Sequence, residues 1–158
     1  MTQFHTADIN PKCCCFSPDG KLIAVAINHI AHVWDITGSD PQLIETFTGH
    51  RHGVASLTFS SSTSLISGSY DKSVKFWQIG SSKTSPVVTG LEFTPLTPAP
   101  IKSITLQAKD SITISSHSDG VVRIWDIVTG ICKATFQTPS KDSNWVDTQL
   151  IDGKLISE

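Results

Sequence analysis

Charge is scarce in this chain, and positive charge is not concentrated at any point along it. Only 16% of the 158 residues are charged, the formal net charge is −2, and the lysines and arginines form no cluster. Binding to a nucleic-acid backbone relies on such a cluster, so we expect no nucleic-acid partner. The hydrophobic share of 39% is enough to bury a single-domain core and argues against wholesale disorder.

Long apolar runs are missing as well. The longest, Leu22 to Ile27, is too short to span a bilayer, and the N-terminus lacks the basic and apolar regions of a leader. We therefore expect a soluble chain without a membrane partner. Cysteine is sparse, and three of the four cysteines are adjacent: Cys13, Cys14 and Cys15. Adjacent strand residues point to opposite faces, so no disulfide framework is indicated, and we expect the reducing environment of the cytosol or the nucleus.

Several motifs that carry chemistry are absent from the sequence. It contains no Gly-x-x-x-x-Gly-Lys or Gly-x-Gly-x-x-Gly loop to hold phosphates, and no Gly-x-Ser-x-Gly elbow to present a nucleophilic serine. Helical periodicity does not occur, whereas short runs of β-branched and aromatic residues alternate with turn-forming residues. The sequence therefore predicts an all-β fold without a cofactor.

A repeat is the main positive feature. Ser67 to Trp77 reads Ser-Gly-Ser-Tyr-Asp-Lys-Ser-Val-Lys-Phe-Trp, and Ser115 to Trp125 has the same layout, with an acid six residues before the tryptophan. Val25 to Trp34 is a third copy, in which Asn28 replaces the acid. An aliphatic residue opens the second strand of each copy at intervals of 43, 47 and 43 residues: Leu22, Leu65, Ile112 and Leu155. A period in the low forties with Trp-Asp ending the third strand is typical of a four-stranded blade.

On these residues, and on Trp34-Asp35 and Trp125-Asp126, the chain resembles the WD-repeat β-propellers. The resemblance implies an incomplete ring of four-stranded antiparallel blades. We expect residues 1–4 to be the tail of a preceding blade, and the following blades to occupy residues 11–47, 49–93, 97–136 and 144–158. Since propellers close with about four to eight blades, we expect the chain to be part of a longer protein.

The resemblance also implies a buried hydrogen-bond network in the second blade, made by His50, Ser67, Asp71 and Trp77. The third blade has a partial set, Ser115, Asp119 and Trp125, with Thr97 where the histidine is expected. The first has Asn28 for the acid and Ala24 for the hydroxyl residue. Serine, histidine and aspartate together are also the composition of a catalytic triad, but without an exposed nucleophile elbow we favour the structural role. We therefore predict no enzyme activity.

The adjacent cysteines allow two interpretations. Together with His29 and His32 they are potential zinc ligands, but three consecutive strand residues cannot converge on one ion. Cys14 aligns with Leu57, so we interpret it as a small core residue, with Cys13 and Cys15 on the other side of the sheet. No metal site is predicted.

The resemblance further places four residues near the rim of a face that often receives partners: Tyr70, Lys72, His117 and Ser118. Isolated charges such as Lys72, Lys75 and Arg123 are interpreted as a solvated surface. We expect other proteins as partners, and possible self-association through open blade faces.

These features favour one function, and two alternatives stay open. The favoured function is a non-catalytic protein–protein interaction scaffold. The second is a ligand-sensing propeller of a NACHT-type nucleoside-triphosphatase signalling protein, because residues 101–145, especially Asp119 to Asp126 and Lys133 to Pro139, look like propellers of fungal proteins of that kind. The third is a structural subunit that closes its ring by self-association.

Overall fold

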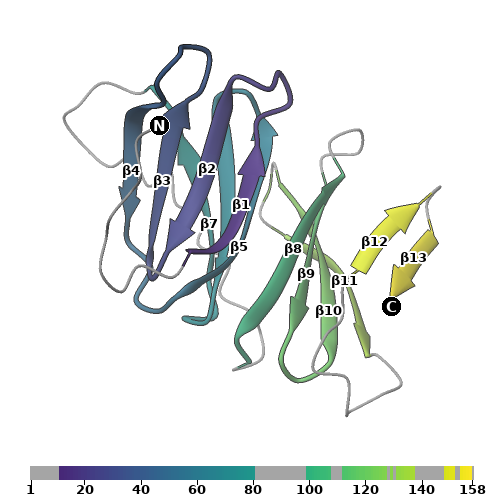
Figure 1. The fold of residues 1–158 in the computed structure, drawn as a ribbon. Coiled ribbons are helices and arrows are strands. Elements are labelled where there is room, and N and C mark those ends of the chain that lie inside the picture. Colours follow the sequence, from purple (N-terminus) through teal and green to yellow (C-terminus); the bar gives the residue numbers. More distant parts are fainter. Residues whose placement is uncertain are drawn as a thin grey trace.

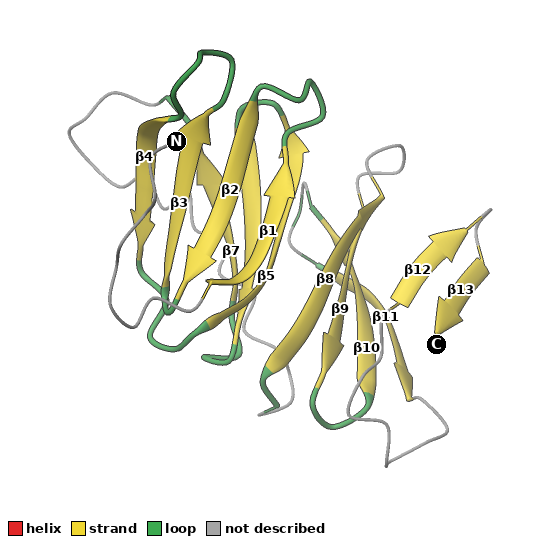
Figure 2. Cartoon of the chain, in the orientation of Figure 1, coloured by secondary structure: helices red, strands yellow, loops and turns green. Residues whose placement is uncertain are grey.

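The computed structural model describes residues 11–80, 99–107, 112–127, 129 and 131–137, together with the backbone of 148–151 and 154–157. Within these ranges every regular element is a β-strand (Figures 1 and 2). The all-β prediction is confirmed. The described residues contain no helix of the length and apolar character that crossing a lipid bilayer requires.

The strands form separate antiparallel sheets in which sequence neighbours pair. The first sheet contains β1 (Pro11–Phe16), β2 (Leu22–Ile27), β3 (Ile30–Asp35) and β4 (Gln42–Thr48). The second contains β5 (Val54–Ser61), β6 (Ser64–Ser69) and β7 (Val74–Gln78). The third contains β8 (Ile101–Gln107), β9 (Ile112–His117), β10 (Val121–Asp126) and β11 (Cys132–Gln137), and a hairpin follows with β12 (Thr148–Ile151) and β13 (Lys154–Ser157).

The sheets agree with partial propeller blades that follow one another along the chain. The position expected for a fourth strand of the second blade and Thr97 lie within residues 81–98, outside the described residues, and the residues before Pro11 are likewise outside them. The predicted blade boundaries therefore stay predictions.

Apolar side chains fill the spaces between consecutive sheets. Between the first and second sheets, Val33 and Phe47 of one sheet pack with Leu57, Leu65 and Trp77 of the other. The rings of Phe47 and Trp77 stack with their centroids 5.0 Å apart. A second cluster joins Ile66 and Val74 of the second sheet to Ile101, Ile104 and Trp125 of the third. Each sheet is thus held by burial of its faces against its neighbours, as stacked repeats require.

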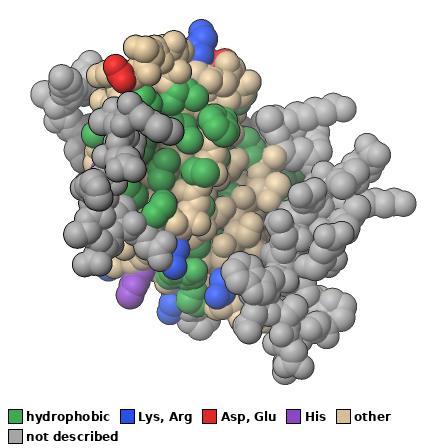
Figure 3. All heavy atoms as spheres, in the orientation of Figure 1, with side chains coloured by type: hydrophobic (Ala, Val, Ile, Leu, Met, Phe, Trp, Pro, Cys, Tyr) green, Lys and Arg blue, Asp and Glu red, His purple; other side chains and the backbone are tan. Residues whose placement is uncertain are grey.

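The outer face of the first sheet is apolar but has no such cover among the described residues. Phe16 is 62% exposed, and Leu43, which pairs with Trp34, is 54% exposed. Figure 3 shows hydrophobic side chains gathered over this sheet. Trp34, on the same face, is only half-buried, whereas its counterpart Trp77 is 3% exposed.

Candidate functional site: the histidine network of the second sheet

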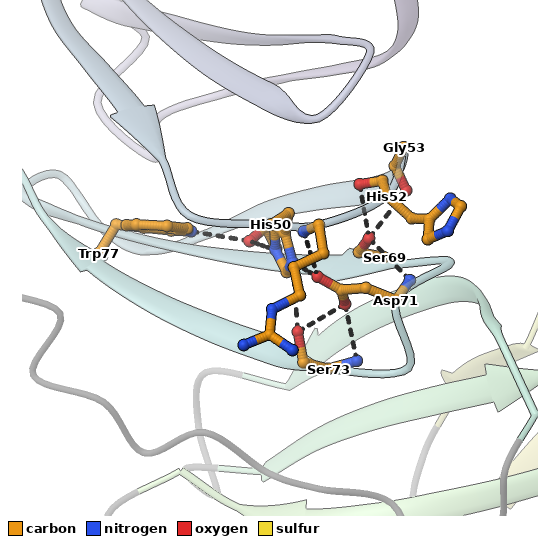
Figure 4. Close-up of polar contacts among 9 residues, drawn as sticks. His50, His52, Gly53, Ser69, Asp71, Ser73 and Trp77 are labelled. Carbon is orange, nitrogen blue, oxygen red and sulfur yellow. Dashed lines mark hydrogen bonds and ion pairs between the residues drawn. The ribbon is translucent and has the colours of Figure 1, made fainter.

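Four sequence-predicted residues meet in the second sheet although they come from four different segments. His50 lies in the loop between β4 and β5, Ser67 on β6, Asp71 in the turn after β6, and Trp77 on β7. Figure 4 shows Trp77 and Asp71 reaching the histidine from opposite sides. The antiparallel pairing of β6 with β7, which sets Leu65 opposite Trp77, brings the strand residues together.

The hydrogen bonds of this network follow one donor order. The Nε1–H of Trp77 donates to Ser67 Oγ at 2.7 Å, and Ser67 Oγ lies 2.6 Å from His50 Nε2. His50 Nδ1 lies 2.8 Å from Asp71 Oδ2. Because a carboxylate only accepts, Nδ1 carries the hydrogen and Nε2 accepts from the serine hydroxyl. The chain of donors therefore runs from tryptophan through serine and histidine to aspartate.

Asp71 accepts further bonds that close the turn around it. The backbone N–H groups of Arg51 and Ser73 each donate to its carboxylate at 2.9 Å, and the Ser73 hydroxyl donates at 2.6 Å. Burial alone would raise the pKa of Asp71, but the bonds from His50, Ser73 and Arg51 together hold it well below its ordinary value. The turn therefore keeps a full negative charge beside the histidine.

Two serines of this network were not singled out in the sequence. Ser69 donates to the backbone oxygens of His52 and Gly53 at 2.9 Å, and it accepts from the Asp71 backbone N–H at 3.1 Å. Ser73 bonds the other side of the same aspartate. The available signal is their spacing, two residues before and two residues after Asp71, from which short hydroxyl side chains reach the turn backbone.

The arrangement of serine, histidine and aspartate does not present a nucleophile. Ser67 is completely buried and His50 is 5% exposed, and the serine oxygen already accepts the Trp77 N–H. A triad serine needs an open approach for the carbonyl that it attacks, together with oxyanion donors beside it. The network is instead suited to satisfying buried polar groups and fixing the loop, the turn and the strands relative to one another.

The third sheet has a network of different composition. Trp125 Nε1 donates to Ser115 Oγ at 2.8 Å, and Ser115 Oγ lies 2.9 Å from His117 Nε2. His117 Nδ1 faces the backbone oxygen of Ala99 at 3.3 Å. The third member of the predicted set, Asp119, is exposed and accepts the backbone N–H of Val121. A histidine two residues after the serine on the same strand therefore takes the histidine position here.

This arrangement corrects the placement of His117 on a partner-binding rim. The side chain is 3% exposed and lies inside the third sheet, whereas Ser118 beside it is exposed. The error has a simple cause, since alternate strand residues face opposite sides and His117 shares the side of Ser115. Of the predicted rim residues, Tyr70, Lys72 and Ser118 remain accessible.

Stability is expected to depend on the protonation of His117. Burial, aided by the nearby Arg123 charge, lowers the pKa of His117 to about 4, although the Ala99 bond and Asp119 act in the opposite direction. The unfolded chain therefore takes up a proton first as the pH falls below 6.5. We expect the free energy of unfolding to drop by about 1–2 kcal/mol between about pH 6.5 and pH 5. Urea titrations should show this loss in the wild type and a smaller one in His117→Asn, and equal losses would contradict the assignment.

The first sheet has a shifted register that corrects another alignment. Ile23 pairs with Trp34 and Val25 with His32, whereas in the second sheet Leu65 pairs with Trp77 and Ser67 with Lys75. Val25, and not Ala24 as predicted, therefore occupies the position that Ser67 has in the second sheet. The turn before β2 is one residue longer than its counterpart, and the turn after β2 is one residue shorter. Asn28, the predicted acid replacement, lies in that short turn with a φ of 55°.

The cysteines lie on the faces that alternation predicts, but the core assignment of Cys14 is wrong. Cys14 is exposed, whereas Cys13 and Cys15 pack against the cluster between the first two sheets. Cys14 shares the uncovered outer face with Phe16, so no described sheet buries it. Burial, the largest cause, raises the pKa of both Cys13 and Cys15 to about 12, so these two thiols stay protonated. Within the described ranges no group of three or more His, Cys, Asp or Glu side chains is placed to hold a metal ion.

Two charged residues are also buried where a solvated surface was predicted. Lys75 is 8% exposed and Arg123 is 1% exposed, although Lys72 is exposed as expected. Lys75 pairs with Ser67, and Arg123 pairs with Ser115, so both stand beside the serine of a network. Their position two residues before the tryptophan turns them toward the neighbouring sheet.

These features together define the class: a β-repeat protein whose antiparallel sheets pack face to face, with buried tryptophan–serine–histidine networks in the second and third sheets. Comparison with known families agrees, since residues 2–35 and 41–78 match the family model described as "WD domain, G-beta repeat". The chain belongs to the WD-repeat family.

Similar proteins include components of several assemblies. The chain is 32% identical over 133 residues to "COMPASS component SWD3" of Saccharomyces cerevisiae, which covers 83% of the chain and 39% of that protein. It is 33% identical over 113 residues to "Autophagy-related protein 16" of Arabidopsis thaliana, covering 70% of the chain and 20% of that protein. It is 27% identical over 127 residues to "Target of rapamycin complex subunit wat1" of Schizosaccharomyces pombe, covering 80% of the chain and 38% of that protein. The chain thus spans well under two thirds of the length of each of these relatives.

Proposed function

We propose that this chain is a non-catalytic protein-binding scaffold segment that acts in the cytosol or the nucleus. The observation that carries the proposal is a continuous rim formed by turns of all three sheets. We call this end of the molecule the turn face, and it comprises Asn28–His29, Arg51–Gly53, Tyr70–Lys72, Lys102 and Ser118–Gly120. It lies at the lower end in Figure 1.

Backbone hydrogen bonds hold the loops of the turn face within the second and third sheets and join the first sheet to the second. The N–H of Val54 donates to the Asn28 oxygen at 2.7 Å, which joins the first sheet to the second. The N–H of Tyr70 donates to the Gly53 oxygen at 3.0 Å, and the N–H of Ser118 donates to the Pro100 oxygen at 2.9 Å. The buried network at His50 fixes the same loops from beneath. A rigid framework that presents variable loop side chains is suited to binding other proteins.

Two relatives bear names that describe a component or a subunit of a complex, and this also supports a scaffold role. The sensing role in a NACHT-type protein stays a prediction. The uncovered face that carries Phe16 and Leu43 favours a second candidate, a structural subunit that associates with a second copy through this face. Light scattering during size-exclusion chromatography tests this candidate: wild type should be dimeric and Phe16→Glu monomeric, and a monomeric wild type would remove it.

The binding role is tested by affinity purification of the tagged chain from cells. We expect a set of proteins to co-purify with the wild type and to be lost when Tyr70, Lys72 and Ser118 are replaced by alanine together. A triple alanine variant of exposed residues at the opposite end, Lys21, Thr37 and Asp40, should retain them. Retention of every protein by the turn-face variant would contradict the proposal.

A further inference from the structure

The two ends of the molecule differ in charge. Around the turn face, the exposed cations of the described residues are Lys12, Arg51, Lys72 and Lys102, with the histidines His29 and His52 beside them. Among the described acids at this end, Asp71 is bonded into the network beneath, whereas Asp119 is exposed. The opposite end carries more acids than bases: Asp19, Asp35, Asp40 and Asp126 against Lys21 and Lys133.

Figure 3 shows several basic side chains and a histidine along the lower end, whereas the upper end shows acidic side chains together with a basic one. The excess of positive charge at the turn face stands against a net charge of −2 for the chain. The polarity is therefore local, and it opposes the overall charge.

Lys72 lies at the tip of the turn between β6 and β7 in a conformation that favours glycine. Its φ is 75°, and Gly120, which is likewise five residues before a tryptophan, has a φ of 77°. A side chain in this left-handed region is sterically costly, and glycine adopts it freely. The second sheet thus presents a cation at a position where the third sheet has the unstrained residue. Backbone strain of this kind is often retained where a side chain serves a purpose.

An aromatic surface lies between the cations. Tyr70 is 38% exposed, and the ammonium group of Lys102 lies 5.6 Å from the centre of its ring. A Cβ on Gly53 would approach the ring at 3.4 Å, so the glycine lets the tyrosine lie close against the loop. The exposed part of Tyr70 and the ammonium group over its ring together offer a peptide an apolar contact beside a cation.

We infer that the turn face binds an acidic peptide segment of a protein partner. Carboxylates of that segment would pair with Arg51, Lys72 and Lys102 while its backbone lies beside the exposed part of Tyr70. The inference rests on the proposed binding function and names the chemistry of the partner. Complementary charge raises the association rate and selects among partners, so an acidic segment is preferred over a neutral one.

The test uses the 158-residue chain and a fluorescein-labelled peptide of alternating glutamate and glycine, with fluorescence anisotropy as the readout. We expect Lys72→Glu to weaken binding by about tenfold, since it replaces an attraction by a repulsion. Lys21→Glu makes the same change of net charge at the opposite end and should leave binding unaltered. A peptide with glutamine in place of glutamate should bind at least about tenfold more weakly than the acidic one.

Lys72→Gly separates binding from folding. It removes the cation and relieves the backbone strain, so we expect a higher Tm together with weaker peptide binding. Loss of binding in this variant cannot be ascribed to unfolding if its Tm is unchanged or raised.

The inference is overturned if the wild type fails to bind the acidic peptide, if Lys21→Glu weakens binding as much as Lys72→Glu, or if duplex DNA of equal charge binds as tightly as the peptide. The proposed function has a separate readout. Partners that co-purify with the wild type and are lost with the alanine triple variant would support it even when the acidic peptide does not bind.

Discussion

Replacing Gly68 with valine is expected to lower the free energy of unfolding by about 3 kcal/mol, because a Cβ at this position meets the adjoining sheet. A Cβ built on Gly68 falls 2.8 Å from Ile101 Cγ2 and from Ile104 Cγ1 and closer still to Ile104 Cδ1, nearer than real Cβ atoms approach. Both isoleucines are buried in the cluster between the second and third sheets, so they have little room to move. Relief therefore requires the two sheets to separate, which exposes apolar surface.

Gly38→Val is the matched control. A Cβ there meets only the backbone of Asp40, at an ordinary van der Waals distance of 3.7 Å. We expect a change within about 0.5 kcal/mol for this loop substitution. Urea denaturation followed by tryptophan fluorescence measures both variants, and equal losses at the two positions would show that the sheets are not packed as closely as the structure has them.

His50→Ala and Asp71→Ala form the second prediction, with an expected loss of roughly 1–3 kcal/mol each. Removing the imidazole leaves the buried Ser67 hydroxyl without its acceptor and takes one of its donors from the Asp71 carboxylate. Removing the carboxylate leaves the backbone N–H groups of Arg51 and Ser73 without their partner. Since these groups act as one unit, the double variant should cost less than the sum of the two single losses.

Asp119→Ala provides the contrast, because Asp119 has the same sequence position in the third sheet but is exposed. The Asp119→Ala substitution should lower the free energy of unfolding by no more than about 0.5 kcal/mol. Thermal denaturation followed by circular dichroism compares the three single variants. An unchanged Tm in both His50→Ala and Asp71→Ala would refute the structural role of the network.

Much of this architecture can be predicted from the sequence because the repeat fixes which residues recur. The spacing from the acid to the tryptophan locates the turn after β6. His50 is found through the family resemblance, which assigns a Gly-His dipeptide, here Gly49-His50, to the loop that enters a blade. These are local relations, and a tight turn between paired strands preserves them. Within the second-sheet network, Ser67, Asp71 and Trp77 keep such relations, whereas His50 reaches them from the preceding loop.

The predicted alignment differs from the structure where two changes in turn length cancel and leave the repeat length the same. In the first sheet the turn before β2 gains a residue and the turn after β2 loses one. The interval of 43 residues from Trp34 to Trp77 is therefore unchanged, but the residues of β2 are shifted by one position. A shift of one residue reverses the face of every side chain in a strand, and this moved Val25 into the place assigned to Ala24. Spacing alone cannot reveal two changes that cancel.

Burial depends on which sheet covers a face, and this is not a local property. Cys14 has the orientation of a core residue, but its face has no described neighbour, whereas Lys75 and Arg123 have the composition of surface residues and lie between sheets. The role of His117 was missed for a related reason. A histidine on β9 replaces one from the loop, and only the folded sheet shows that the two reach the same serine position.

One experiment directly tests whether Ser67, His50 and Asp71 form a structural hydrogen-bond network and not the catalytic site of an enzyme. The folded chain is incubated with a fluorophosphonate, which modifies activated serines, and its intact mass is measured. We predict an unchanged mass, because Ser67 is fully buried and its oxygen is bonded to Trp77. A covalent adduct that maps to Ser67 in the folded protein, and that disappears in His50→Ala, would contradict this account.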